Sequence, residues 1–350
     1  MFCHSPKIGI DRETVKFVGQ HPKSLAAFTA IIHIQIIELL ESAMSFPRRQ
    51  FLTGGAALSA SGLFGLGPSI GHAQVALGDI KIDIVSDGSL TLPGSFIFGP
   101  MPQDELLPIL KKYGQSPDAL TPPCNVTLMR QGDRTILFDV GSGTDFSPNS
   151  GILLDSLDAL KVAPEDVTDI VFTHAHPDHL WGLLDDFDDP LFPEANYMIG
   201  KAEWDYWMNP NTIEDIETAR VSFAVGAQRR LQMIEDKIEF FSDGDEIMSG
   251  VMARSTFGHT PGHMALELRQ GSESLMILGD CVGNDHIAFA KPEWNSGSDQ
   301  DQETAAATRT ILMDQLAHEK MRVIGYHLGS NGLGYVDKMS DGYAFVPEAT

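Results

Sequence analysis

Short apolar runs of strand type alternate with longer amphipathic runs from residue 80 to residue 325. Residues 80–85 read Ile-Lys-Ile-Asp-Ile-Val, and this period of two predicts a strand with one buried face. Apolar runs bounded by turn residues predict further strands over residues 125–129, 135–138, 169–172, 238–241, 251–256, 264–268, 274–278 and 322–325. Helical spacing of apolar residues predicts helices over residues 152–160, 180–185, 201–208, 216–234 and 301–320.

Strands and helices mix along this whole stretch, without the regular alternation of a doubly wound parallel sheet. No internal repeat, low-complexity block or Pro/Gly-rich linker interrupts the pattern. The sequence therefore predicts one α/β sandwich domain.

Residues 44–73 have a different pattern, in which two arginines precede an uncharged stretch. Arg48 and Arg49 are followed by Phe51-Leu52, no charged residue occurs from 51 to 73, and small residues stand at 71 and 73. The segment resembles a twin-arginine export signal, which implies passage through the twin-arginine translocase and a periplasmic or secreted protein. A membrane anchor or a buried helix is the alternative, but four glycines and a proline between residues 62 and 71 disfavour both.

Residues 1–43 match no part of such a signal, which normally lies close to the N-terminus. We therefore interpret Met44 as the start of the protein and residues 1–43 as translated upstream sequence. The alternative is an amphipathic helix over residues 24–43, which is shorter than a comfortable membrane span and contains His33 and Gln35. The folded domain is expected to occupy residues 74–350.

Charge and cysteine content exclude several classes of protein. The chain carries 48 acidic and 24 basic residues, and the part from residue 74 onward carries 44 and 18, a formal charge of −26. Nucleic acid is not an expected partner, because each phosphate contact needs a Lys or Arg. Three cysteines are too few for a disulfide scaffold or a four-thiolate zinc site. The spacing of Cys124 and Cys281 does not tell whether they pair.

A dense histidine motif directly follows the strand predicted at residues 169–172. Residues 174–179 read His-Ala-His-Pro-Asp-His, which places three imidazoles and a carboxylate within six residues. His174 and His176 can bind one ion, because side chains two apart in an extended segment share a face. Asp178 and His179 follow at the turn into the next helix and can face a second ion. Imidazole and carboxylate suit zinc and neighbouring divalent metals, so the motif predicts a metal site.

This motif resembles the signature of the metallo-β-lactamase superfamily, and three downstream segments fit the resemblance. Gly258-His-Thr-Pro-Gly-His supplies His263, Leu278-Gly-Asp supplies Asp280, and Tyr326-His supplies His327. The resemblance implies a four-layer αββα sandwich that holds two divalent ions. Zinc is the expected ion, and manganese, cobalt and iron are the alternatives.

The resemblance also implies which residue holds which ion. Asp280 would bridge the two ions together with a hydroxide. The first ion would be held by His174, His176 and His263, and the second by Asp178, His179 and His327.

Four further residues near these segments have less specific signals. Asp139 matches the family's strand-end aspartate, which orients a ligand histidine through its second ring nitrogen, and a simple turn aspartate is the alternative. His259 is expected to shape its loop rather than to bind metal. His286 and His318 show no partner pattern, so a core or solvent-exposed position is expected for each.

The implied chemistry is that of a two-metal hydrolase. Two cations about 3.5–4 Å apart lower the pKa of a shared water, so that hydroxide is available at neutral pH. They also polarise the carbonyl or phosphoryl oxygen of the substrate. Asp178 or Asp280 is expected to carry the proton to the leaving group.

Within the superfamily, the sequence resembles the methyl parathion hydrolase-like group, which is related to quorum-quenching lactonases, from residue 77 to residue 347. That group lines its pocket with aromatic residues, and Phe146, Trp207 and Phe223 fall near the corresponding positions. Trp207 is the strongest pocket candidate, and core packing is the alternative for each. An apolar pocket in an acidic protein fits an uncharged ester, lactone or organophosphate triester. A homodimer is implied by the resemblance alone.

Other activities of the superfamily fit the residues less well. Class B β-lactamases carry Cys or Ser where this chain has Asp280, which disfavours β-lactam hydrolysis. His176 in place of Glu disfavours the di-iron oxygen-reducing branch. The main alternative is an oxidoreductase such as a persulfide dioxygenase, which uses one iron and does not need Asp178 and His179 as ligands. A non-catalytic metal-binding module is the third option.

Overall fold

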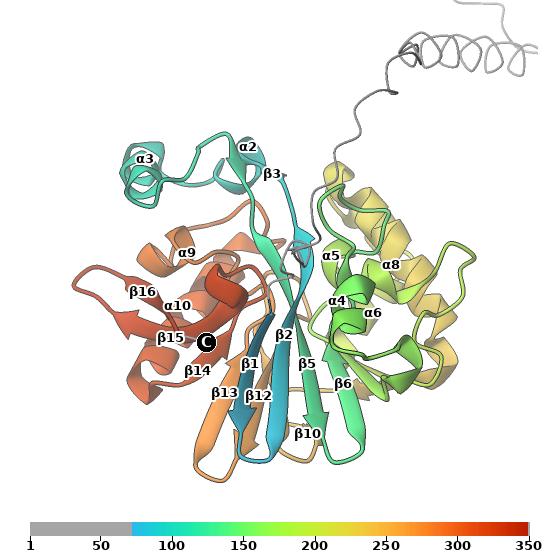
Figure 1. Cartoon of the computed structure of the whole chain (residues 1–350). Helices are drawn as coiled ribbons and strands as arrows, with labels where there is room; N and C mark the ends of the chain where they lie inside the picture. The colour runs from blue at the N-terminus through green and yellow to red at the C-terminus, as the bar shows by residue number, and fades with distance from the viewer. Residues whose placement is uncertain (1–71, 349–350) are drawn as a thin grey trace, which may run out of the picture. The chain divides into compact units, whose positions relative to one another are not determined.

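The computed structural model describes residues 72–348, and two seven-stranded sheets form its centre (Figure 1). The upstream extension predicted at 1–43 and the signal peptide predicted at 44–73 lie outside the described residues, apart from residues 72 and 73. The first sheet has the order β1 (His72–Leu77), β2 (Ile80–Ser89), β5 (Pro123–Gln131), β6 (Arg134–Phe138), β7 (Asp169–Phe172), β8 (Asn196–Gly200) and β9 (Ile238–Phe241). The second has the order β10 (Glu246–Met248), β11 (Val251–Ser255), β12 (Met264–Gln270), β13 (Glu273–Ile277), β14 (Arg322–Ile324), β15 (Leu333–Lys338) and β16 (Tyr343–Pro347).

The two sheets pack face to face through alternate residues of their strands. On β2 the residues Ile80, Ile82 and Ile84 are fully or almost fully buried, while Lys81 between them is exposed. They share one apolar cluster with Leu266 and Leu268 of β12. The apolar residues that recur at every second position of the strand therefore form the inner face of a sandwich.

Helices cover the outer face of each sheet (Figure 1). The helices α4 (Leu153–Ala159), α6 (Lys201–Met208) and α8 (Val221–Met233) pack on the first sheet, and α9 (Ile287–Ala290) and α10 (Gln302–Glu319) pack on the second. The four-layer αββα sandwich expected from the sequence is thereby confirmed. Shorter helical segments are α5 (Pro177–Leu180), α7 (Thr212–Asp215) and the 3-10 turns Pro164–Asp166, Trp181–Leu183, Thr218–Arg220, Glu235–Lys237 and Ser330–Gly332.

One segment between β2 and β5 stands apart from the four layers, and we call residues 92–120 the insert. It contains β3 (Leu92–Pro93), α2 (Gly94–Ile97), α3 (Gln103–Lys112) and β4 (Ala119–Leu120). β3 pairs with β4, so that Leu92 lies opposite Leu120. The insert has its own small apolar cluster, which Ile287 of α9 joins.

Most predicted elements match the structure, and two helices differ from their prediction. The strands at residues 169–172 and 238–241 and the helix at 201–208 have the predicted bounds. The helix predicted at 180–185 is wrong, because α5 begins at Pro177, whose fixed φ suits a first helical turn, and the chain is extended at Leu184. The helix predicted at 216–234 begins only at Val221, after a 3-10 turn.

The first strand begins two residues before the predicted domain boundary. Ala73 is buried and pairs with Ile84 of β2. His72 places its Nε2 atom 2.7 Å from a carboxylate oxygen of Asp83. Cleavage after Ala73 would therefore shorten β1 by two paired residues.

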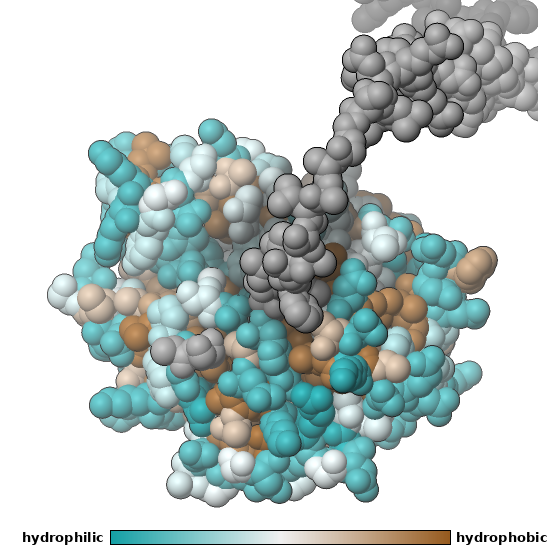
Figure 2. All heavy atoms as spheres, in the orientation of Figure 1, coloured by the Kyte–Doolittle hydropathy of each residue, from teal (hydrophilic) through white to brown (hydrophobic). Residues whose placement is uncertain are grey.

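On the face shown in Figure 2, hydrophilic residues predominate and apolar residues are scattered among them. Within residues 72–348, none of the helices combines the length and the apolar character that crossing a membrane requires.

Candidate metal centre

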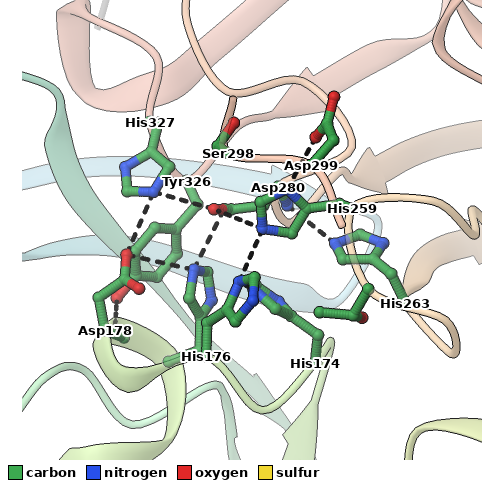
Figure 3. Close-up of polar contacts among 12 residues, drawn as sticks. His174, His176, Asp178, His259, His263, Asp280, Ser298, Asp299, Tyr326 and His327 are labelled. Carbon is green, nitrogen blue, oxygen red and sulfur yellow. Dashed lines mark hydrogen bonds and ion pairs between the residues drawn. The ribbon is translucent and has the colours of Figure 1, made fainter. Parts of the chain in front are cut away.

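Loops that follow β7, β11, β13 and β14 bring histidine and aspartate side chains together (Figure 3). The side chains form two adjoining groups, in each of which the ligand atoms lie within 4.8 Å of one another. We call them the three-histidine cluster and the Asp/His cluster. The three-histidine cluster consists of His174, His176 and His259, and the Asp/His cluster consists of Asp178, His179, Asp280 and His327.

Ring nitrogens face each other at close range in the three-histidine cluster. Nδ1 of His176 lies 3.1 Å from Nε2 of His174 and 2.8 Å from Nε2 of His259. All three residues are buried, and burial lowers the pKa of His174 and His176 well below the ordinary value. These two imidazoles are therefore neutral at neutral pH and can offer lone pairs to a metal.

Hydrogen bonds on the outer side of the rings fix the tautomer of His174 and His259. The ring nitrogen that faces the cluster is then the unprotonated one, with a free lone pair. Nδ1 of His259 lies 3.0 Å from a carboxylate oxygen of Asp299 and donates to it. Nδ1 of His174 donates to the hydroxyl of Thr173, because that hydroxyl already donates to Asp139. His174 and His259 therefore present unprotonated Nε2 atoms to Nδ1 of His176 at about 3 Å, where a proton on Nδ1 or a bound cation can satisfy their lone pairs. This donor set fits a divalent metal ion.

His176 differs from the other two because it presents Nδ1 to the cluster. Its Nε2 atom lies 3.1 Å from the side-chain amide of Gln300. If the amide of Gln300 is flipped by 180°, its oxygen accepts a hydrogen bond from the Nε2–H group of His176. Nδ1 of His176 is then unprotonated and can bind a metal. His176 also occupies the N-cap position of α5, so the helix that follows fixes its backbone.

The structure does not bring His263 into the cluster, which contradicts its predicted role as a ligand. The backbone N–H of Asp280 donates to Nε2 of His263 at 2.9 Å. The other ring nitrogen, Nδ1, lies 2.8 Å from the hydroxyl of Thr256. Both nitrogens are thus engaged away from the three-histidine cluster. His263 supports the loop that carries Asp280, and His259, which we expected to shape the loop, points its nitrogen at the cluster.

Asp280 lies between the two clusters. Its Oδ1 atom is 3.1 Å from Nε2 of His179, and its Oδ2 atom is 3.1 Å from Nε2 of His327. Oδ2 is also 3.5 Å from Nε2 of His259 in the three-histidine cluster. One carboxylate therefore faces nitrogens of both groups, which is the position expected of a shared ligand.

Outer contacts orient the two histidines of the Asp/His cluster. Nδ1 of His179 donates to Asp139 at 2.8 Å, the contact expected of that strand-end aspartate. Nδ1 of His327 donates to the backbone oxygen of Pro123 at 2.8 Å. Both rings consequently direct Nε2 toward the carboxylates of Asp178 and Asp280.

The electrostatics of the Asp/His cluster favour charged groups despite full burial. Burial alone would raise the pKa of Asp280, but His327 and His179 outweigh it and lower that pKa well below the ordinary value. Burial would likewise lower the pKa of His179, but Asp280 and Asp178 raise it well above its ordinary value. Oδ2 of Asp178, Nε2 of His179 and Oδ1 of Asp280 make no hydrogen bond within residues 72–348. Buried atoms of this kind without hydrogen bonds fit a cation that all three would contact.

Several supporting residues had no signal in the sequence. Asp299 lies in a short polar loop without periodicity, and Arg309 of α10 contacts its second oxygen at 3.2 Å. Tyr326 donates its hydroxyl to the backbone oxygen of Asp178 at 2.6 Å. The ring of Tyr326 also stacks on His179, with centroids 3.9 Å apart. These contacts depend on segments far apart in the chain, so local pattern does not reveal them.

A partly open cavity lies beside the two clusters, and Asp178, Asp280 and His327 line one part of it. Phe146 and Phe223 line it as predicted, and their ring centroids are 5.9 Å apart. The prediction that Trp207 lines the pocket is wrong. Trp207 is fully buried in the core and does not line the cavity. Most of the remaining apolar wall comes from the insert and from α9, namely Leu92, Phe96, Ile97, Met101, Leu120, Ile287 and Ala288.

The remaining candidate residues belong to neither ligand cluster. Cys124 and Cys281 are both buried free thiols, and burial raises their pKa to about 11 and about 12. Neither is paired within residues 72–348, and the raised pKa keeps both thiols protonated at neutral pH. His286 is buried at the start of α9, and His318 lies near the end of α10.

Comparisons with known proteins agree with this geometry. The model of the metallo-beta-lactamase superfamily matches residues 121–318, more than half of the chain. A solved structure of AidC, a dizinc quorum-quenching lactonase in complex with a product N-hexanoyl-L-homoserine, is 29% identical with a TM-score of 0.76, over 80% of this chain and 98% of its own. The hydrolase AbOPH of the beta lactamase superfamily is 26% identical with a TM-score of 0.75, over 81% and 99% of the two chains. The search of curated proteins returned no match.

Proposed function

Because the chain belongs to the metallo-β-lactamase superfamily and carries two adjoining ligand clusters, we propose that it is a dinuclear metal-dependent hydrolase that opens uncharged lactones. The observation that carries the proposal is a shared carboxylate, Asp280, between two complete donor sets beside an apolar cavity. Aryl esters and phosphotriesters react through the same kind of attack, so they are the competing substrates in the test.

The proposed ligands differ from the sequence-based assignment at one position. His259 takes the place of His263, because only His259 directs a free nitrogen toward the cluster. Asp280 would be shared by both ions. The first ion would be held by His174, His176 and His259, and the second by Asp178, His179 and His327. Zinc is the proposed ion, since AidC is a dizinc enzyme.

The protein's own groups have distinct roles in such a reaction. When bound, two divalent ions would supply a nucleophile at neutral pH and polarise the lactone carbonyl. Attack on that carbonyl breaks the acyl carbon–oxygen bond, and the departing alkoxide needs one proton. Asp178 lines the cavity, and its Oδ2 atom makes no hydrogen bond within the described residues. Oδ2 faces the ligand nitrogens of His179 and His327. We therefore propose that the other oxygen of this carboxylate, Oδ1, carries a proton from the attacking water to the alkoxide.

The cavity favours an uncharged substrate with an apolar chain. Phe146, Phe223 and the insert offer apolar contacts within the cavity, and the ring centroid of Phe223 lies 5.9 Å from that of His176. The sequence from residue 74 onward has a formal charge of −26, which repels anionic phosphates. An N-acyl lactone combines a neutral ring for the metal ligands with an apolar tail for this wall.

A substrate panel with defined metals tests the proposal. Metal-free protein is reloaded with zinc, cobalt or manganese and assayed on N-acyl lactones, aryl esters and phosphotriesters. We expect about two ions per chain, the highest kcat/KM on N-acyl lactones, and one acid equivalent released for each ring opened. The proposal fails if phosphotriesters or aryl esters are hydrolysed and lactones are not. One iron per chain with oxygen consumption would instead support the oxidoreductase alternative.

We also propose that the protein is exported by the twin-arginine route, on the strength of Arg48-Arg49 and the uncharged stretch after them. N-terminal sequencing of protein from the periplasm or medium is expected to give a start at or near Gln74. A mature N-terminus upstream of residue 44 would contradict both the signal and the interpretation of residues 1–43.

A further inference from the structure

Glu203 is a fully buried carboxylate on the first turn of α6 that contacts neither cluster directly. Among residues 72–348 it forms no ion pair with a Lys, Arg or His. A buried carboxylate without a cationic partner is costly unless hydrogen bonds satisfy it. Its hydrogen bonds therefore indicate what it does.

Four donors contact the Glu203 carboxylate, and three of them come from the two loops of the three-histidine cluster. Oε1 accepts from the backbone N–H of Ala175 at 2.9 Å, and Ala175 lies between His174 and His176. Oε2 accepts from the hydroxyl of Thr260 at 2.7 Å and from the backbone N–H of Gly262 at 3.0 Å. One side chain thus joins the loop of the first two ligands to the loop that carries His259.

The remaining donor holds the carboxylate in place. The indole N–H of Trp207, one helical turn further along α6, donates to Oε1 at 2.6 Å. Gly262 allows the close approach, because a Cβ atom there would lie 2.0 Å from the backbone nitrogen of Glu203. Both oxygens act only as acceptors, which is the hydrogen-bonding pattern of an ionised carboxylate.

We propose that Glu203 is a positioning residue that sets the distance between the His174–His176 loop and the His259 loop, and thereby the metal affinity of the three-histidine cluster. The inference rests on the proposed ligand set. It does not depend on the substrate. Loss of an outer contact of this kind typically lowers metal affinity about 10–100-fold.

Glu203→Gln is the central variant, because it keeps the shape of the side chain. The amide can accept from only one of the two donor pairs, so one loop loses its bonds. Thr260→Val removes a single donor on the His259 side and leaves the carboxylate intact. Asp169→Asn is the matched control. It alters another buried carboxylate, paired with Arg134 at the opposite end of β7 from the metal loops.

Cobalt affinity should be measured separately for each cluster. The double variant Asp178→Asn/His327→Ala leaves only the three-histidine cluster intact, and His176→Ala/His259→Ala leaves only the Asp/His cluster. Metal-free proteins are titrated with Co²⁺, and binding is followed by the visible absorption of the ion and by competition with a chelator. Unfolding of each metal-free protein is measured in parallel.

We expect Glu203→Gln to weaken Co²⁺ binding about 10–100-fold at the three-histidine cluster and less than about 3-fold at the Asp/His cluster. Thr260→Val should show a smaller loss at the same cluster, and Asp169→Asn should bind Co²⁺ as the parent does. If Glu203→Gln does not fold, Thr260→Val carries the test alone.

Two results would overturn the inference. One is an equal loss of affinity at both clusters, and the other is unchanged Co²⁺ affinity combined with a less stable metal-free protein. Either would show that Glu203 has only a general structural role. A protein that shows the predicted Co²⁺ behaviour but does not open lactones would refute the proposed substrate and leave the role of Glu203 standing.

Discussion

Two histidines four residues apart in one loop have different roles, and their hydrogen bonds distinguish them. His259 donates from Nδ1 to Asp299 and keeps Nε2 free for the cluster. His263 accepts the backbone N–H of Asp280 with the nitrogen that a metal would need. In the sequence both follow a glycine within the same six residues, Gly258–His263. The sequence predicted that this loop supplies a ligand, but only the folded positions of Asp299 and Asp280 identify which histidine it is.

Single alanine variants distinguish the two residues. His259→Ala removes a proposed ligand, so we expect about one ion fewer per chain and a loss of kcat/KM greater than the 10–100-fold typical of an outer contact. His263→Ala leaves every proposed ligand in place, so the variant should retain about two ions with weaker activity. Elemental analysis after dialysis measures the ion content. Loss of an ion from His263→Ala with full occupancy in His259→Ala would contradict the assignment.

Asp299 should affect metal binding through His259. Asp299→Ala removes the acceptor that fixes the ring orientation of His259, so Zn²⁺ affinity in chelator competition should fall about 10–100-fold. Asp314→Ala on α10 is the control, because Asp314 is exposed and contacts Lys338 and Tyr343 at the surface. A Zn²⁺ affinity that is equal in the two variants would refute the role of Asp299.

At the scale of elements, the predicted strands and helices were most accurate where burial dictates the pattern. β7 is buried at every position, and its bounds match the prediction. The elements of the insert were not predicted, because its apolar runs are short and bounded by glycine and proline, and Pro108 stands inside α3. β1 was also missed, since its first residues lay inside the predicted signal peptide. Short elements whose stability comes from packing on a neighbour leave little local pattern.

Asp87 at the end of β2 links two loops behind the metal site and gives folding a pH dependence. Its carboxylate accepts from the backbone N–H and hydroxyl of Ser142 and from the backbone N–H of Leu153. Burial raises its pKa to about 6, above the ordinary 3.8, and these hydrogen bonds only partly oppose the rise. Between these two values the folded state binds more protons than the unfolded state, so this carboxyl group favours folding increasingly as pH falls.

Asp87→Asn should remove that contribution, because the amide does not titrate. As pH falls from 7 to 4, the free energy of unfolding of the parent should rise relative to the variant, by about 3 kcal/mol at most. Urea unfolding of both proteins across this pH range measures the difference, and effects of the metal site cancel in the comparison. A difference that stays constant with pH would show that Asp87 does not titrate as described.

At the scale of the whole molecule, the two clusters connect the two halves of the sandwich. His174, His176, Asp178 and His179 follow a strand of the first sheet, whereas His259, Asp280 and His327 follow strands of the second. The sequence predicted the sandwich and most of these residues, because the family motifs are local. It could not predict the outer contacts of Asp299, Arg309 and Glu203, which join segments far apart in the chain.

Removal of metal should therefore destabilise the whole domain. A ligand that binds only the folded state stabilises it by about 2.7 kcal/mol per site when its free concentration is 100-fold above Kd. We expect chelation to lower Tm, and added Zn²⁺ to restore it in a concentration-dependent way. His259→Ala is the control, in which the effect of chelation should be smaller. An unchanged Tm after complete metal removal would refute this coupling.

The pairing of Leu92 with Leu120 has an evolutionary consequence. The insert leaves the domain and returns to it at neighbouring points, so its length and sequence can change without moving the strands on either side. It supplies much of the apolar wall of the cavity, whereas every proposed metal ligand lies after residue 173. Selection can therefore act on the apolar wall of the cavity while the proposed metal ligands are inherited unchanged. A graft of the insert between related proteins at these two residues is a direct route to a new substrate preference.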